Sequence, residues 1–177
     1  MDHLVVLLRG INVGRNRQIP MGDLRALLEE AGYADVQTLL RSGNVVLATD
    51  QAPGDAARAI EDLIAARFGF DVAVLVRTGE EIAAVVAANP HAEVATDGSK
   101  YHVAFLDGVP DAGAIANLTA RDFEPERLAA RGREIYVWCP DGLADSAAIK
   151  ALAKAKLGVT TTVRNWNTVT KLLAMTE

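Results

Sequence analysis

Two short stretches of the sequence concentrate side chains that bind anions. Residues 9–20 hold Arg9, Arg15 and Arg17 without any acidic residue, and residues 164–168 read Arg-Asn-Trp-Asn-Thr. Guanidinium groups pair with phosphate and carboxylate oxygens, and amides and hydroxyls can orient such ligands. These residue types therefore predict the binding of an anionic small molecule, such as phosphate or a nucleotide.

The first stretch has the composition of an anion-binding loop. Gly10 and Gly14 permit unusual dihedrals and close backbone approach, and the stretch ends at a predicted helix start, whose free N–H groups favour anions. It is neither a Walker loop nor a Gly-x-Gly-x-x-Gly fingerprint. A polar, solvated connection is an equally good interpretation. We take Arg9, Gly10, Asn12 and Gly14 as candidate ligand-binding residues.

The second stretch opens the last predicted helix. Asn165, Asn167 or Thr168 could cap that helix, and Trp166 could pack against the core. Two amides, a hydroxyl, a guanidinium and an indole in five residues exceed what a cap requires. The candidate ligand-binding residues here are therefore Arg164, Asn165, Trp166, Asn167 and Thr168.

A third polar segment, Arg41-Ser42-Gly43-Asn44, joins two apolar runs and fits a tight hairpin. Turn chemistry alone explains these residue types. Ser42 lacks a Gly-x-Ser-x-Gly elbow, so we do not predict a nucleophile there. Ser42 and Asn44 are kept as candidate ligand-binding residues.

The order of predicted elements runs through twice, over residues 3–89 and 100–175. Apolar runs at 4–8, 45–48 and 72–76 indicate strands with both faces covered. The order predicts an α+β fold of two tandem ferredoxin-like βαββαβ halves, each with a trailing helix, packed into one compact unit. The predicted subdomains are residues 1–90 and 91–177. In such a half we expect the loop after the first strand and the hairpin at Ser42 to lie at opposite sheet edges.

Local signals place the predicted helices and strands. Leu24, Leu27, Leu28 and Ala31 form one helical stripe, and we expect Asp55 to cap the next helix. Residues 78–81 have capping-box spacing. In the second half we predict a helix over 111–118, a strand pair over 123–128 and 134–139, and a longer helix over 146–157.

Composition excludes several classes of function. The chain has 177 residues, is 50% hydrophobic, and carries a net charge of −5 with a pI near 5.2. Such a charge argues against bulk non-specific binding of nucleic acid or membrane. No signal peptide or membrane-spanning run is recognised, which predicts a cytoplasmic protein. The three histidines are scattered and Cys139 falls in a strand, so we expect no metal site and no cofactor.

Three ordered motifs carry a resemblance to a known family: Leu8-Arg9-Gly10-Ile11-Asn12-Val13-Gly14, Ser42-Gly43-Asn44 and Arg164-Asn165-Trp166-Asn167-Thr168. The chain resembles the bacterial family catalogued as domain of unknown function 1697. That resemblance implies a small soluble bacterial protein with a two-part α+β fold, and no established activity. In the family Gly14 is commonly followed by Gly and the hairpin Ser is preceded by Gln. Arg15 and Arg41 stand there instead.

Three functions are consistent with these residues. The first is a binding protein that holds an anionic ligand, such as a phosphate, nucleotide or nucleic acid, through Arg9, Asn12 and the segment that begins at Arg164. The second is an enzyme in which Arg9 or Arg164 stabilises developing negative charge while Asn or Ser side chains orient a substrate. The third is a self-association or protein-interaction module in which Trp166 belongs to an exposed apolar patch. The sequence leaves the oligomeric state open.

Overall fold

A computed structural model describes residues 1–177, and the chain divides into two compact units. Unit 1 comprises Met1–Ala84 together with Lys171–Glu177, and unit 2 comprises Val85–Thr170. Each unit contains one four-stranded antiparallel sheet and its helices. The predicted α+β fold with two similar ferredoxin-like halves is confirmed. The predicted boundary after residue 90 stays a prediction.

The sheet of unit 1 is built from β1 (Asp2–Leu8), β2 (Ala34–Leu39), β3 (Asn44–Thr49) and β4 (Val74–Thr78), in the order β2-β3-β1-β4. All neighbouring strands are antiparallel. The two central strands, β1 and β3, are buried almost along their whole length. Their continuous apolar sequences therefore correspond to strands with both faces covered, as predicted.

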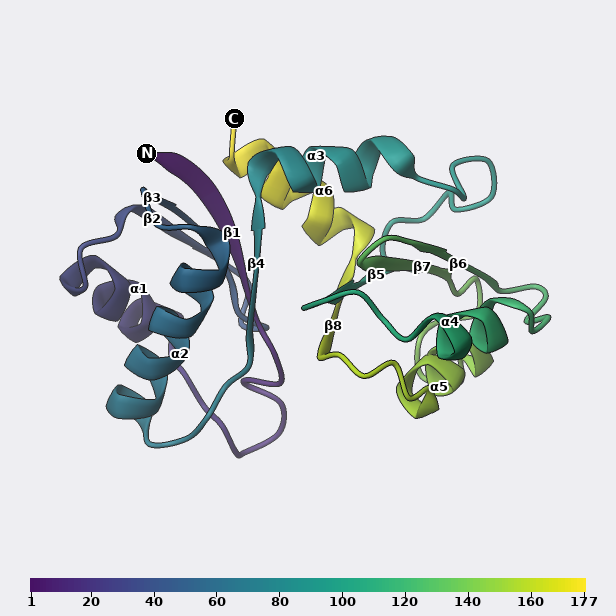
Figure 1. The fold of residues 1–177 in the computed structure, drawn as a ribbon, viewed down its shortest axis with the longest axis horizontal. Helices are drawn as coiled ribbons and strands as arrows, with labels where there is room; N and C mark the ends of the chain where they lie inside the picture. Colours follow the sequence, from purple (N-terminus) through teal and green to yellow (C-terminus); the bar gives the residue numbers. More distant parts are fainter. The chain divides into compact units, whose positions relative to one another are not determined.

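Two helices cover one face of this sheet, α1 (Met21–Glu30) and α2 (Pro53–Phe68), which lie side by side (Figure 1). The prediction that Asp55 caps α2 is wrong. The cap is Ala52, followed by Pro53, and Asp55 lies in the first turn, where it pairs with Arg58 at 2.5 Å. Proline suits the first helical position because its ring fixes φ and no N–H is needed there. A side-chain cap was therefore dispensable.

The helix α3 (Gly79–Ala88) follows β4 and begins with the predicted capping box. The Thr78 N–H donates to Oε2 of Glu81 at 2.8 Å, and the Glu81 N–H donates to Oγ1 of Thr78 at 3.1 Å. Each residue thus satisfies a backbone donor that the helix leaves without an internal partner.

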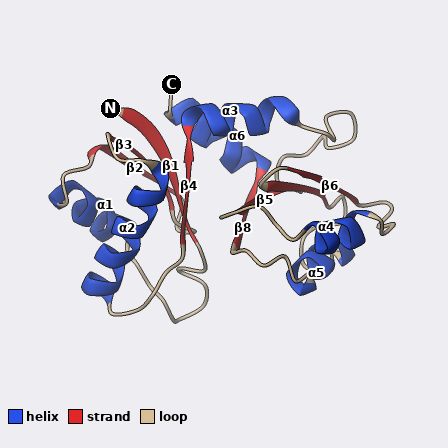
Figure 2. Cartoon of the chain, viewed as in Figure 1, coloured by secondary structure: helices blue, strands red, loops and turns tan.

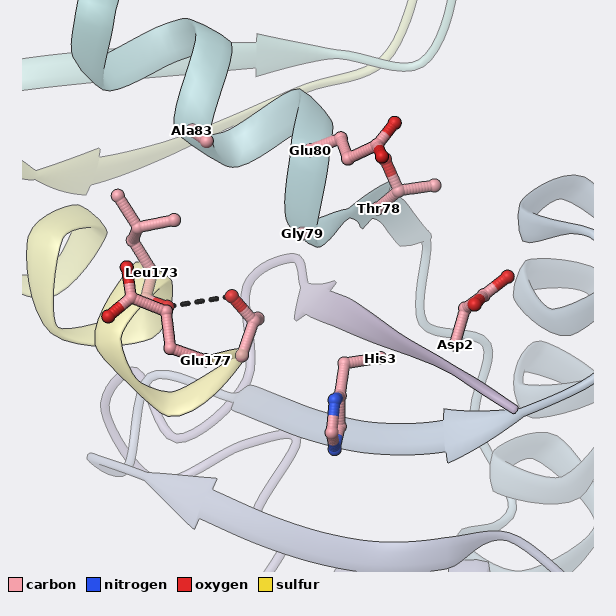
Figure 3. Close-up of a pocket in the computed structure, with 9 residues that line it drawn as sticks. Asp2, His3, Thr78, Gly79, Glu80, Ala83, Leu173 and Glu177 are labelled. Carbon is pink, nitrogen blue, oxygen red and sulfur yellow. Dashed lines mark hydrogen bonds between the residues drawn. The ribbon is translucent and has the colours of Figure 1, made fainter.

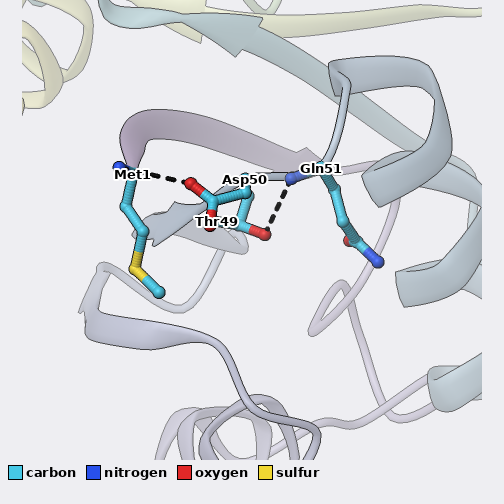
Figure 4. A network of polar contacts seen from close by, with 4 residues as sticks. All are labelled: Met1, Thr49, Asp50 and Gln51. Carbon is cyan, nitrogen blue, oxygen red and sulfur yellow. Dashed lines mark hydrogen bonds and ion pairs between the residues drawn. The ribbon is translucent and has the colours of Figure 1, made fainter.

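An exposed ion pair joins the chain at the end of β3 to the N-terminus before β1, and a local hydrogen bond forms the turn beside it (Figure 4). The amino group of Met1 lies 3.2 Å from Oδ1 of Asp50, and the N–H of Gln51 donates to Oγ1 of Thr49 at 3.2 Å. The Asp50 side chain is largely exposed, so the ion pair adds at most about 1 kcal/mol. The register between the two strands depends mainly on their backbone ladder.

The sheet of unit 2 repeats this arrangement with β5 (Tyr101–Leu106), β6 (Arg127–Arg131), β7 (Glu134–Trp138) and β8 (Thr161–Asn165), in the order β6-β7-β5-β8. The strand predicted over 123–128 begins only at residue 127, so its first four residues were wrongly assigned. Residue 125 is a proline, which cannot donate to a strand ladder, and the side chain of the next residue binds a helix start instead.

Unit 2 contains α4 (Ala112–Thr119) and α5 (Ala147–Lys154), which lie next to each other in Figure 2, together with the end of α3 and the first half of α6 (Trp166–Met175). Asp111 caps α4 by accepting from the Ala114 N–H at 2.8 Å. The prediction that α5 continues to residue 157 is wrong.

The early end of α5 has a local cause. Ala155 is extended, and the chain beyond it buries Leu157, whose carbonyl accepts a 2.8 Å bond from the Asp111 N–H at the start of α4. Continuing the helix would remove Leu157 from the core and break this bond. Tertiary packing thus overrides the good helix propensity of the Ala-Lys repeat. None of the helices of either unit has both the length and the apolar character needed to cross a lipid bilayer.

Candidate functional site

The amide of Asn12 joins the loop after β1 to the hairpin between β2 and β3. Its Nδ2 donates to the carbonyl of Ile19 at 2.9 Å and to that of Arg41 at 2.6 Å, while Oδ1 accepts from the Ile19 N–H at 2.8 Å. Asn12 itself has a left-handed backbone with φ 56°. The amide thereby closes the loop upon itself and fixes the loop against the hairpin.

The expectation that this loop and the hairpin lie at opposite sheet edges is wrong. β1 and β3 are antiparallel neighbours, so the end of one strand lies beside the start of the other. Leu7 pairs with Asn44, and the Leu8 N–H donates to the carbonyl of Gly43 at 2.9 Å. The loop and the hairpin therefore leave the sheet at the same end. We call residues 9–19 and 40–43 together the basic loop.

Glycines have two different roles in the basic loop. A Cβ at Gly43 would lie 2.8 Å from Cβ of Leu8 and 2.9 Å from Cδ1 of Ile11, and φ there is +92°, so only glycine fits. Gly10 and Gly14 also have positive φ, but a Cβ at either would meet no atom within 4 Å. These two positions leave the backbone open to solvent.

Two long polar side chains brace the loop from outside. Arg17 donates from Nε to the carbonyl of Gly10 at 3.1 Å and from Nη2 to that of Asp71 at 2.6 Å, and its guanidinium lies 5.4 Å from the centre of the Phe70 ring. Gln18 donates to the carbonyl of Gly14 at 2.8 Å. The loop is therefore held in one conformation by its own side chains.

The basic loop contains four exposed arginines, Arg9, Arg15, Arg17 and Arg41. No acidic residue occurs in either of its segments. Arg41 also donates from Nη2 to Oε1 of Gln18 at 3.3 Å. The exposed apolar side chains Val13 and Leu40 belong to the same loop, with 74% and 59% of their surface accessible.

The two candidate residues of the hairpin differ in exposure. Ser42 is exposed, whereas Asn44 is fully buried. Nδ2 of Asn44 donates to the carbonyl of Leu39 at 2.7 Å and to Oγ of Ser42 at 3.1 Å. Asn44 therefore shapes the turn from within, and Ser42 lies on its outer side.

The segment that begins at Arg164 belongs to unit 2, and two of its five residues, Arg164 and Thr168, are buried. Arg164 is only 7% exposed, and its Nη1 donates to Oγ1 of Thr162 at 2.7 Å and to the carbonyl of Val163 at 3.0 Å. Burial lowers the pKa of its guanidinium to about 10, so the group stays protonated at neutral pH. Its charge is therefore held inside the protein.

The remaining residues of that segment start α6. Oδ1 of Asn165 accepts from the N–H of Thr168 at 2.9 Å, so Asn165 is the N-cap of α6. The side chain of Thr168 is buried. The Asn167 N–H donates to the carbonyl of Gly98 at 3.4 Å, and its amide side chain lies so close that a Cβ at Gly98 would collide with it. These amides fasten the start of α6 to unit 2.

Trp166 belongs to an aromatic cluster of unit 2. Its ring centre lies 4.9 Å from that of Tyr101 and 6.4 Å from that of Tyr136. The Tyr101 hydroxyl donates to Oδ1 of Asn89 at 2.7 Å, and the Tyr136 hydroxyl donates to the carbonyl of Val85 at 2.7 Å. The rings thus pack against one another inside unit 2, while the two tyrosine hydroxyls are hydrogen-bonded.

The structure brings six of the predicted site residues together in unit 1: Arg9, Gly10, Asn12, Gly14, Ser42 and Asn44. The other five follow one another in unit 2.

Among the cavities that sequence reasoning missed, two gather several charged side chains from distant segments. An acidic one in unit 1, of about 430 Å³, is shown in Figure 3 and is lined by the carboxylates of Asp2, Glu80 and Glu177 and by His3. Residues from β1, the start of α3 and the end of α6 contribute to its lining. No group of three His, Cys, Asp or Glu side chains in the protein is arranged to hold a metal ion.

The second missed cavity, of about 300 Å³, lies between α4 and α5 in unit 2. Its polar lining is Asn117, Arg121, Lys154 and Lys156, and its apolar lining is Ala114, Leu118, Ala151 and Ala155. One sequence signal could have located it: no acidic residue occurs between Asp145 and Glu177. We call this cavity the basic pocket.

Comparison with known proteins gives a family and a fold. The chain superposes on a solved structure of the conserved bacterial protein SP0830 from Streptococcus pneumoniae with a TM-score of 0.82 and 23% identity, over 99% of each chain. At that identity the likeness shows the shared fold alone. No significant match is found among curated proteins. The profile of one family, described as a protein of unknown function (DUF1697), matches residues 1–136, and the chain therefore belongs to that family.

Proposed function

We propose that the protein binds a phosphate-bearing ligand at the basic loop. The single observation that carries this proposal is that four exposed arginines belong to one loop, which Asn12, Arg17 and Gln18 brace. A site that is already ordered loses less conformational entropy on binding than a mobile one. Guanidinium groups also match phosphate oxygens in two-pronged geometry.

The net charge of the whole protein means that anion binding must depend on the local surface of the basic loop. The chain carries a net charge of −5, so a long-range attraction for anions is absent and binding must depend on the local guanidinium groups. Open backbone at Gly10 and Gly14 lets a ligand approach the loop closely. The exposed Val13 and Leu40 offer apolar contact to a sugar or base. These features support a nucleotide or a short nucleic-acid strand as the source of the phosphate.

The proposal uses the basic loop and leaves the Arg164 segment aside. Arg164, Asn165 and Trp166 are engaged in hydrogen bonds and ring contacts of unit 2, which supports a structural role. A ligand of this kind is abundant in the cytoplasm, and we place the protein there as part of the same proposal.

Calorimetric titration of the full chain tests the proposal, with inorganic phosphate, ATP and a short single-stranded RNA in separate arms. Arg15→Ala and Arg41→Ala are each expected to weaken binding by roughly ten- to a hundredfold, because one charge-assisted contact is worth roughly 1.5–3 kcal/mol. A preference for RNA with a strong salt dependence would identify a nucleic-acid backbone, and a preference for ATP would identify a free nucleotide.

The matched control is Arg58→Ala, which removes an exposed guanidinium already paired with Asp55. It should leave every affinity unchanged. Equal affinities of the parent protein, Arg15→Ala and Arg41→Ala for all three ligands would refute the proposal, as would the absence of binding in every arm.

A further inference from the structure

The basic pocket of unit 2 presents cations above an apolar floor. Ala114, Asn117 and Leu118 lie on one face of α4, and Ala151 and Lys154 lie on one face of α5, because residues three and four apart share a helix face. Ala155, the residue directly after α5, completes this side of the lining. Leu118 and Ala151 are buried and form the floor. Arg121, Lys154 and Lys156 are exposed and form the rim.

The three rim cations have no polar partner in the protein. Neither lysine makes an ion pair or a hydrogen bond. The Arg121 guanidinium lies 4.9 Å from the centre of the Phe123 ring, which holds the group in place while leaving its N–H donors unused. Cations that serve to end a helix often donate to its last carbonyls. Here carbonyls of the last turn accept instead from the backbone N–H of the residue that follows each helix, Ala120 after α4 and Ala155 after α5.

The electrostatic balance of the pocket is positive. It lies at the C-terminal ends of α4 and α5, each of which contributes about half a negative charge at most. Three side chains supply three full positive charges, and the lining contains no carboxylate. The nearest acidic residue in sequence, Asp122, uses Oδ1 to accept from the Glu124 N–H at 3.0 Å. The net field at the mouth of the pocket therefore attracts anions.

We propose that the basic pocket binds a small organic phosphate of about the size of a mononucleotide. Lys154, Lys156 and Arg121 would hold the phosphate at the rim, and the apolar part of the ligand would cover Leu118 and Ala151. The Asn117 amide would orient a polar edge of that part. A volume of about 300 Å³ lies at the lower end of ligand cavities, which excludes larger compounds. This site belongs to unit 2 and does not rest on the function proposed for the basic loop.

Site-resolved NMR titration of the full-length protein tests this proposal, with AMP, adenosine and inorganic phosphate as the probes. AMP is expected to shift the backbone amide signals of residues 117–121 and 151–157. It should bind more tightly than either inorganic phosphate or adenosine, because only AMP engages both the rim and the floor. Signals that shift only in residues 9–19 would overturn this proposal and would support the basic loop instead.

Charge reversal provides the matched variants. Lys154→Glu and Lys156→Glu should each weaken AMP binding at this pocket at least tenfold. Lys150→Glu, an exposed position on the same helix outside the pocket lining, should weaken it less than twofold. Equal losses in all three variants would indicate a general charge effect and would overturn the proposal. Inorganic phosphate binding as tightly as AMP would overturn the role of the apolar floor.

Discussion

Asn12 combines a left-handed backbone with an amide whose two donors and one acceptor all have partners in the basic loop. Asparagine tolerates this conformation better than other residues with a side chain. The residue therefore serves the loop twice, by its backbone and by its hydrogen bonds. Its part in any ligand site would be to position the arginines around it.

We predict that Asn12→Ala lowers the free energy of unfolding by about 2–4 kcal/mol, since three hydrogen bonds are lost and alanine disfavours positive φ. Asn12→Gly should lower the free energy of unfolding by about 1 kcal/mol less than Asn12→Ala does. Glycine loses the same hydrogen bonds as alanine but adopts positive φ without a steric penalty. Urea unfolding followed by circular dichroism measures both. Identical midpoints for the parent protein and the two variants would contradict this account of the loop.

Two histidines of unit 2 have pKa values lowered by their surroundings. Burial lowers the pKa of His102, whose Nε2 has no hydrogen-bond partner. Burial and then the charges of Arg127 and Arg131 lower the pKa of His91. Both imidazoles thus take up a proton more readily in the unfolded chain than in the folded one.

We predict that the protein loses stability as the pH falls below about 6.5, the ordinary histidine pKa, because the unfolded state then binds more protons. His102→Leu should reduce the slope of stability against pH between neutral and mildly acidic conditions, leaving the share due to His91. Chemical unfolding at a series of pH values provides the measurement. A variant with an unchanged slope would show that His102 does not drive the effect.

At the scale of elements, the start of α5 is held by a residue that sequence patterns assigned to a strand. Oε1 of Glu126 accepts from the N–H groups of Ala147 at 2.9 Å and Ala148 at 3.2 Å, and Oε2 accepts from the hydroxyl of Ser146. Oγ of Ser146 accepts in turn from the Ile149 N–H at 3.0 Å. The Glu126 side chain and the start of α5 are some twenty residues apart in sequence and come together only in the folded protein.

We predict that Glu126→Ala destabilises unit 2 by about 2 kcal/mol, since it leaves two N–H groups at the start of α5 and one hydroxyl without an acceptor. Glu124→Ala, an exposed neighbour, is the control and should change stability by less than about 0.5 kcal/mol. Combining Glu126→Ala with Ser146→Ala should cost less than the sum of the two single changes, because both residues serve the same helix start. Strict additivity in the double-mutant cycle would contradict a shared cap.

Most elements were predictable because periodicity and caps agreed with the tertiary structure. The apolar runs at 4–8 and 45–48, the stripe of Leu24 and Leu28, and the box at 78–81 all carry strong local signals. The start of β6 and the end of α5 failed for a common reason. In both places a contact with a segment distant in sequence decides where the strand begins or where the helix ends.

At the scale of the whole molecule, the two halves share details beyond their strand order. Arg77 near the end of β4 and Arg164 near the end of β8 are both buried, and each donates from Nη1 to the carbonyl of the preceding residue. A capping residue follows each one, Thr78 or Asn165, before the next helix. The repeated order read from the sequence is therefore repeated in side-chain geometry.

The candidate site was only partly accessible from sequence. The arginines and glycines of residues 9–19 could be singled out by type, and so could the hairpin at residues 41–44. Their proximity could not, because it depends on β1 and β3 being neighbours in the sheet. The basic pocket has lysines and an arginine from segments about thirty residues apart, which no short motif connects.

The aromatic cluster around Trp166 has a practical consequence. Both tryptophans of the chain, Trp138 and Trp166, lie in unit 2, whereas unit 1 has a single tyrosine, Tyr33, and no indole. Selectively excited indole emission therefore observes one half of the molecule, while far-ultraviolet dichroism observes both. Comparing the two signals during denaturation would reveal whether the halves melt in one step or in succession, without any added label.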